Sequence, residues 1–195
     1  MRNLLILILF LLLVAGVSLL LFRQPAEWST DSSEALLEFQ RGLDARMKMY
    51  NDEASAHFAR ALELDPEFVA AKLVYRGCCV DSETRQQMTE ELRQAEMAGL
   101  TARERFMLEY DLADADQQWD ERDRLLEEYL DKHPKDPFAL WMWASDAWHD
   151  ADLTEAEKRY RQLLEIDPNW VQAQNRLGYI AMALGRFAEA EQLFE

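Results

Sequence analysis

Residues 137–170 read PFALWMWASDAWHDADLTEAEKRYRQLLEIDPNW, and this stretch decides the fold. Apolar residues recur at helical spacing on both sides of a polar break at residues 150–152, which predicts two helices joined by a short turn. Asp152 or Thr154 is suited to cap the second helix. Pro168 ends that helix, because proline lacks a backbone N–H and clashes with the preceding turn. One such pair cannot bury both of its apolar faces, so it needs similar pairs on either side.

The pattern returns along the chain with a fixed period. The positions of Pro134 and Pro168 differ by 34, those of Pro66 and Pro134 by twice 34, and those of Gly42 and Gly178 by four times 34. The residues twelve, eight and five positions before each proline fall on one helical face. These are Ala54, Phe58 and Ala61 before Pro66, Arg122, Leu126 and Tyr129 before Pro134, and Ala156, Tyr160 and Leu163 before Pro168. At the step without a proline, Leu100, the same offsets hold Met88, Leu92 and Ala95.

This pattern resembles the tetratricopeptide repeat, a helix–turn–helix unit of about 34 residues. The residues that carry the resemblance are Gly42, Ala54, Phe58, Ala61, Pro66, Trp143, Ala156, Tyr160, Pro168, Leu177, Gly178, Ala190 and Phe194. It implies an all-α fold, a right-handed superhelical solenoid of antiparallel helix pairs with about four and a half units. Over residues 34–195 we expect units at 35–68, 69–102, 103–136, 137–170 and, incomplete, 171–195. The second unit is degenerate, and the third has Tyr110 and Arg122 where Gly and Ala are usual. Residues 101–104 nevertheless predict a capping box, from Thr101 to Glu104, for the first helix of the third unit.

The N-terminus predicts a membrane anchor. Residues 4–22 carry no charge over 19 positions, and as a helix they would be roughly 28 Å long, enough to span a bilayer. We interpret residues 1–23 as an uncleaved transmembrane signal anchor, because the apolar run continues past the small residues at 16–18. Residues 24–33 then form a spacer, with Trp28 at the membrane interface and a capping box at residues 31–34.

The short tail before the anchor favours a repeat domain outside the cytoplasm, and we expect a single-pass protein of a bacterial inner membrane with the repeat domain in the periplasm. The net charge disfavours one class of partner. With 37 acidic and 21 basic residues the net charge is −16, which disfavours nucleic acid, since phosphate binding requires clustered Lys and Arg.

No arrangement of residues predicts catalysis, a cofactor or a metal site. The sequence has no Gly-rich phosphate loop and no His-Glu-x-x-His motif. His149 with Asp150 and Asp152 is interpreted as a capped helix end rather than a metal site. The adjacent Cys78 and Cys79 lack zinc-ligand spacing, and we expect buried structural cysteines. The chain is therefore predicted not to be an enzyme.

The resemblance implies that the first helix of each unit lines a concave groove. Steps of one period place three rows on that face: Phe39, Leu73, Met107, Trp141 and Asn175; Leu43, Gly77, Asp111, Ser145 and Tyr179; Arg46, Val80, Asp114, Trp148 and Met182. From these rows we predict a partner-binding set of Met107, Asp111, Asp114, Trp141, Ser145, Trp148, Asn175, Tyr179 and Met182. Adaptable apolar surface beside two aspartates suits an apolar protein or peptide segment that carries Lys or Arg.

The leading hypothesis is a membrane-anchored, non-catalytic scaffold or adaptor that binds a protein or peptide partner in this groove, in the assembly of an envelope or secretion complex. One alternative is a structural subunit of a permanent membrane complex or homo-oligomer. Another is the N-terminal part of a larger protein with a further domain after residue 195, because Phe187 and Phe194 are expected to be left partly uncovered.

Overall fold

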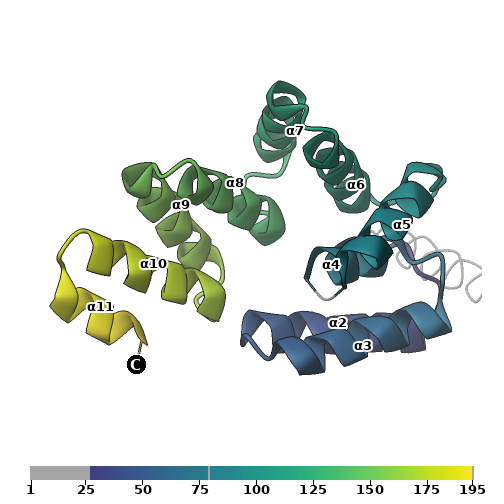
Figure 1. Cartoon of the computed structure of the whole chain (residues 1–195), viewed down its shortest axis with the longest axis horizontal. Coiled ribbons are helices and arrows are strands. Elements are labelled where there is room, and N and C mark those ends of the chain that lie inside the picture. Colours follow the sequence, from purple (N-terminus) through teal and green to yellow (C-terminus); the bar gives the residue numbers. More distant parts are fainter. Residues whose placement is uncertain (1–26, 79, 195) are drawn as a thin grey trace, which may run out of the picture.

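The computed structural model describes residues 27–78 and 80–194, and within these ranges the chain is all-α, with ten helices and no strand. Successive helices form antiparallel pairs that follow one another around an arc (Figure 1). The helices are α2 Ser33–Met47, α3 Asn51–Leu64, α4 Val69–Cys78, α5 Ser82–Arg93, α6 Ala102–Ala115, α7 Trp119–Lys132, α8 Pro137–His149, α9 Leu153–Ile166, α10 Val171–Ala183 and α11 Phe187–Phe194.

The apolar segment at residues 4–22 lies outside the described residues. Within the part of the chain that the structure describes, none of the helices has the length and apolar character needed to cross a bilayer. Cys78 ends α4 and is disulfide-bonded. It is half-buried rather than buried as expected.

The turn inside four of the five pairs repeats one backbone conformation at one position of the period. Met49, Gln117, Ala151 and Gly185 have φ angles of 66°, 58°, 59° and 75°, and their numbers differ by 68, 34 and 34. A left-handed residue at this position reverses the chain after the first helix of a pair. The equivalent position in the second unit, residue 83, lies instead inside α5, which agrees with the degenerate sequence of that unit.

The predicted helix caps are largely confirmed. Asp152, rather than Thr154, caps α9 by accepting a hydrogen bond from the Glu155 N–H at 3.0 Å. The capping box that begins at Thr101 forms completely with Glu104. The box expected at residues 31–34 does not form; one residue later, Ser32 caps α2 by accepting from the Ala35 N–H at 3.1 Å.

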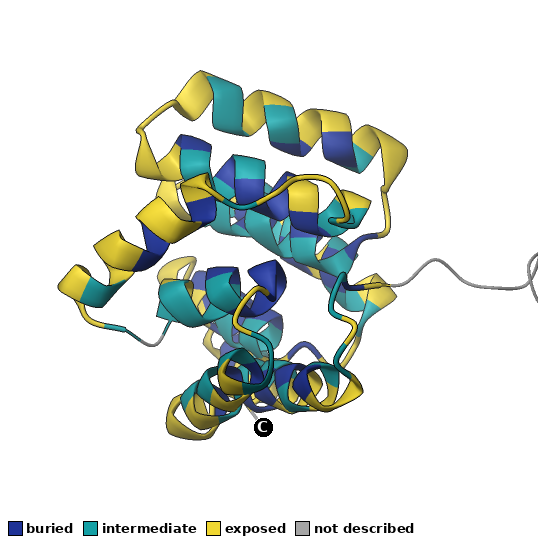
Figure 2. Cartoon of the chain, turned by 90° about the vertical axis from the view of Figure 1, so that its right-hand side faces the viewer, coloured by how far each residue is buried: buried dark blue, intermediate teal, exposed yellow. Residues whose placement is uncertain are grey.

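Glycine and a large aromatic ring meet inside two of the pairs. A Cβ atom at Gly42 would lie 2.5 Å from the Phe58 ring, and one at Gly178 would lie 2.4 Å from the Phe194 ring. Glycine is therefore required at both places for the paired helices to approach as closely as they do. Figure 2 shows buried residues where neighbouring helices meet and exposed residues on the outer side of the molecule.

Tyr110 and Arg122, the two unusual residues of the third unit, both contact Asp146 of the fourth unit. The Tyr110 hydroxyl donates to Asp146 Oδ1 at 2.9 Å, and Arg122 Nη1 lies 3.6 Å from the same carboxylate. The guanidinium of Arg122 also lies over the Tyr110 ring, with 5.7 Å between Cζ and the ring centroid. Burial, together with the neighbouring Asp146 charge, raises the pKa of Tyr110 above its ordinary value. A polar network thus replaces the usual packing of small residues between α6, α7 and α8.

The interpretation of Trp28 as a membrane-interface residue is wrong. Its side chain is 4% exposed and belongs to the apolar core of the first three units. The ring makes edge contacts with Phe39 and Phe138, at centroid distances of 4.9 and 5.6 Å. Residues 27–30 therefore pack against the helices.

Glu157 of α9 forms an ion pair with Arg186 of the last pair, and this contact leads to a pH prediction. Glu157 accepts from Arg186 at 3.0 and 2.6 Å and from Arg161 at 2.8 Å. The hydrogen bonds from Arg186 are the main cause that lowers the pKa of Glu157 below its usual value of 4.5. Because the folded-state pKa is lowered, this stabilisation is present above about pH 4.5 and is lost as the pH falls through the folded-state pKa.

We therefore expect Glu157→Gln to lower the free energy of unfolding by about 1–3 kcal/mol at pH 7 and by less at acidic pH. The measurement is urea unfolding followed by circular dichroism between pH 3 and 7. The exposed Glu165, on the same helix, supplies the control variant Glu165→Gln. A loss that stays constant over this pH range would contradict the prediction.

Candidate functional site

The first and fifth helix pairs touch, so the arc closes into a ring. The Gln172 side-chain amide of α10 donates to the Arg46 carbonyl at 2.9 Å, and the Asn175 amide lies 3.2 Å from Met49 Sδ. Met47 packs against the apolar core of the last two units. Figure 1 shows the α2–α3 turn beside α10. The concave face is consequently enclosed on the side where an open solenoid would leave it free.

A pocket of about 170 Å³ lies at the centre of this ring. The first helix of every pair contributes to its wall, and the residue before α10 contributes as well. The lining residues are Leu43, Arg46, Met47, Leu73, Val74, Gly77, Met107, Asp111, Phe138, Trp141, Met142, Trp170 and Gln172. Ten of these thirteen are apolar or glycine, so the pocket is an apolar chamber with a small number of polar groups.

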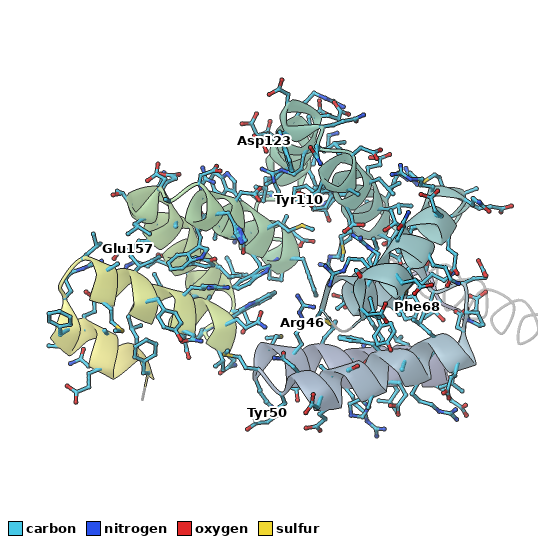
Figure 3. All side chains as sticks on the ribbon, in the orientation of Figure 1. Arg46, Tyr50, Phe68, Tyr110, Asp123 and Glu157 are labelled. Atoms are coloured by element: carbon cyan, nitrogen blue, oxygen red, sulfur yellow. The ribbon has the colours of Figure 1, made fainter. Side chains whose placement is uncertain are left out.

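Arg46 is the cation of the pocket, and Figure 3 shows its side chain pointing from α2 into the space that the ring encloses. Its Nη1 donates a long, marginal hydrogen bond to the Val74 carbonyl oxygen at 3.5 Å. Within the described residues it forms no ion pair with a carboxylate. Burial lowers the pKa of the guanidinium below its ordinary value, yet arginine stays charged in proteins. A partly buried charge without a counter-ion favours an anionic ligand.

Asp111 is the carboxylate of the pocket, and it already has a partner. Its Oδ1 accepts a short hydrogen bond from Arg76 Nη2 of α4. Burial is the main cause that raises the pKa of Asp111, and the Arg76 charge opposes the shift. Because this carboxylate is neutralised by Arg76, the three charged groups at the pocket leave an excess of one positive charge, in a chain whose net charge is −16.

The structure brings together three of the nine residues predicted to bind a partner. Met107, Asp111 and Trp141 line the pocket. Asp114 pairs with Arg122 at 3.3 Å, and Ser145 Oγ lies 3.3 Å from the Tyr160 hydroxyl. The remaining four lie elsewhere: Trp148 under Arg176, Asn175 at the ring closure, Tyr179 against Phe194, and Met182 on the surface, where it is 47% exposed.

The predicted set left out several lining residues. Leu43, Arg46, Leu73 and Gly77 fall at the same 34-residue steps as the chosen residues, so the period itself could have found them. Met47, Val74, Phe138 and Met142 are neighbours of row residues on the same helices. Trp170 and Gln172 reach the pocket because the ring closes, and no spacing in the sequence indicates that closure.

Residues able to hold a metal do not gather in the described part of the chain. Groups of three or more His, Cys, Asp or Glu side chains at metal-binding distance are absent there. His149 and Asp150 lie at the end of α8, where Asp150 is the C-cap residue.

These features define the class of the protein as an all-α repeat protein, built of antiparallel helix pairs around a central pocket. Its last pair matches the tetratricopeptide repeat family model over residues 171–195. A comparison with curated proteins found no match.

Several solved structures are similar to this chain at low identity. The crystal structure of MamA is 18% identical, with 78% of this chain and 90% of that chain covered and a TM-score of 0.45. YrrB, described as a TPR protein with an unusual peptide-binding site, is 18% identical, with 82% of each chain covered and a TM-score of 0.41. The type IV pilus biogenesis factor PilW is 18% identical, with 84% and 76% covered and a TM-score of 0.43.

Proposed function

We propose that the protein is a non-catalytic scaffold that holds a partner protein by a short segment, one side chain of which enters the central pocket. The observation that carries this proposal is Arg46, a guanidinium without a carboxylate partner among the described residues, at the wall of an apolar chamber. Apolar walls with one or two placed polar groups are typical of binding sites.

The size of the pocket limits what enters it. A volume of about 170 Å³ is close to that of an engineered apolar cavity of about 150 Å³ that binds benzene, so it suits one aromatic or branched aliphatic side chain. The walls supply Met47, Met107 and Met142, whose flexible thioethers adapt to different shapes. The partner would therefore present one large apolar residue to the ring.

The charged residues of the pocket indicate which group of the ligand lies next to its apolar side chain. The sequence predicted a basic segment because of Asp111 and Asp114, but both carboxylates are ion-paired, with Arg76 and Arg122. Among the described residues, Arg46 has no carboxylate partner, so its guanidinium can bind an anionic group of the ligand. We therefore propose a ligand with an acidic group next to its apolar side chain.

Selection from a displayed random-peptide library on the purified full chain tests this function. We expect enriched peptides to combine Asp or Glu with Leu, Phe or Trp. Because a hydrogen bond to a charged group contributes about 1.5–3 kcal/mol, Arg46→Gln is expected to weaken the best peptide by about 10–100-fold, and Arg46→Glu by at least as much. Calorimetry gives the dissociation constants.

Arg41 supplies the matched control, since it lies on the same helix but is 55% exposed and paired with Glu38. Arg41→Glu should leave the affinity unchanged. Equal affinities for wild type and both Arg46 variants, or an enrichment of basic peptides, would refute the proposed ligand chemistry.

The membrane anchor forms the second part of the proposal. Residues 4–22 would hold the scaffold at a bacterial inner membrane with the repeat domain in the periplasm, where it would raise the local concentration of membrane-bound partners in an envelope or secretion complex. The absence of any charged residue throughout this run supports the anchor. Activity of a periplasmic reporter fused after residue 195 is the expected result, and activity of a cytoplasmic reporter alone would reverse the orientation.

A second candidate function, a subunit of a permanent assembly, is favoured by the outer face of the last pair. Large apolar side chains are exposed there: Tyr179 47%, Met182 47%, Leu184 49%, Phe187 69% and Phe194 46%. Such a patch is typical of a protein–protein interface. Sedimentation of the full chain over a range of concentrations distinguishes the two, because a stable monomer argues against a homo-oligomer.

A further inference from the structure

The segment Glu27–Thr30, here called the strap, lies across the first helices of three pairs. Trp28 contacts Phe39 of α2 and Phe138 of α8 through its edges, and the Arg103 guanidinium of α6 lies over its ring at 5.2 Å. Such a contact between a cation and an aromatic ring is attractive. These three residues, together with Glu104, are called the Trp28 slot.

Polar contacts hold the strap on both sides of the tryptophan. Ser29 donates to Glu104 Oε1 twice, from its backbone N–H at 3.0 Å and from its hydroxyl at 2.8 Å. Before the tryptophan, Glu27 accepts from Arg103 Nη1 at 2.5 Å, and after it the Thr30 hydroxyl donates to Asp65 at 2.5 Å. The strap is thus bound by backbone, aromatic and charged groups together, as an extended peptide is bound by a groove.

The Trp28 slot and the central pocket belong to one concave surface. Phe138 is common to both, because it contacts Trp28 and also lines the pocket. Phe39 is the first member of the 34-residue row whose next three members, Leu73, Met107 and Trp141, line the pocket. The Trp28 side chain therefore fills one compartment of the concave surface, and the pocket beside Arg46 is the adjoining compartment.

We propose that the strap is a built-in occupant of a recognition site, and that the Trp28 slot binds a partner segment of the form acidic residue–Trp–Ser or Thr in competition with it. Each element of this motif corresponds to one contact. Arg103 pairs with the acidic residue, the rings of Phe39 and Phe138 enclose the indole, and Glu104 accepts from the hydroxyl residue. This inference extends the proposed function from the pocket to a second compartment of the same groove.

Because the strap is part of the same chain, its effective concentration determines how strongly it competes with an outside peptide. A segment attached by a short linker has an effective concentration in the millimolar range. If the free segment binds with a dissociation constant of about 100 µM, the attached strap weakens an outside peptide by about tenfold. A partner therefore gains access either by binding more tightly than the strap or by adding contacts in the neighbouring pocket.

The test uses a labelled, end-capped peptide of residues 24–33, QPAEWSTDSS, and the full chain in detergent. The Trp28→Ala chain should bind this peptide at least tenfold more tightly than the wild-type chain does. The same peptide with alanine in place of its tryptophan should not bind. Fluorescence anisotropy measures both, and circular dichroism confirms that the variant chain is folded.

Ser29→Ala provides a second variant if Trp28→Ala fails to fold, because it removes the Ser29 hydroxyl contact with Glu104 and keeps the tryptophan. It should raise the affinity for the outside peptide to a smaller degree. A folded variant that does not bind the peptide, or equal binding of the two peptides, overturns the inference.

An additional variant distinguishes a failure of the strap proposal from a failure of the proposed function. Arg46 is not part of the slot, so Arg46→Glu should leave the affinity of the strap peptide for the Trp28→Ala chain unchanged. If the strap peptide does not bind, selected peptides can still bind in a way that depends on Arg46, and the proposed function stands. If the selected peptides do not bind but the strap peptide does, the strap proposal stands.

Discussion

Replacing Tyr160 with alanine is expected to lower the free energy of unfolding by about 3–5 kcal/mol, the usual range when a buried aromatic residue is truncated. Tyr160 is 0% exposed and lies in the apolar core of the last two units. Its ring contacts Trp141 with 5.5 Å between centroids. Urea unfolding of the full chain, followed by far-ultraviolet circular dichroism, measures the change.

The same substitution should also damage the pocket. Trp141 lines the pocket and packs against the Tyr160 ring. The cavity that replaces this ring would allow the indole of Trp141 to move away from the ligand. Tyr160→Phe is the matched control. It removes the hydroxyl contact with Ser145 at 3.3 Å and should cost about 1 kcal/mol. A loss below about 1 kcal/mol for Tyr160→Ala would show that this aromatic position does not hold the pair together.

Replacing Glu104 with alanine is expected to be as damaging, by about 3–5 kcal/mol. Its side chain is 0% exposed. One carboxylate oxygen accepts from the N–H and hydroxyl of Ser29, and the other accepts from the Thr101 N–H at 3.0 Å. Removal leaves three donors without their acceptor, and a buried unpaired donor costs about 1–3 kcal/mol.

Glu109→Ala on the same helix is the control, because Glu109 is half-buried and its carboxylate forms no ion pair within the described residues. Equal urea midpoints for Glu104→Ala and Glu109→Ala would mean that the strap and the cap of α6 contribute little.

The helical pairs and their spacing could be predicted from the sequence because their causes are local. Asp152, Thr101 and Pro168 mark helix ends through their own backbone and side-chain chemistry, and 34-residue steps repeat the same interface. Even the tight contact of Gly42 with Phe58 follows from two residues of one unit.

The candidate site could be predicted only in part. Met107, Asp111 and Trp141 lie where equal steps along a regular solenoid place them. Tyr179 and Met182, which follow the same steps, lie at the exposed end of the array and do not reach the pocket. Steps of 34 residues treat every unit as equivalent. Which residues reach the pocket depends instead on how far the array of helix pairs curves.

The sequence by itself determined that this chain is an array of paired helices, since helix caps, helix-breaking prolines and small residues act within about one unit. Only the tertiary structure decided that the first pair meets α10 through Arg46 and Gln172, and that Trp28 enters the groove. Both contacts join residues far apart in the chain. They depend on the summed curvature of five pairs, and no local pattern specifies that sum.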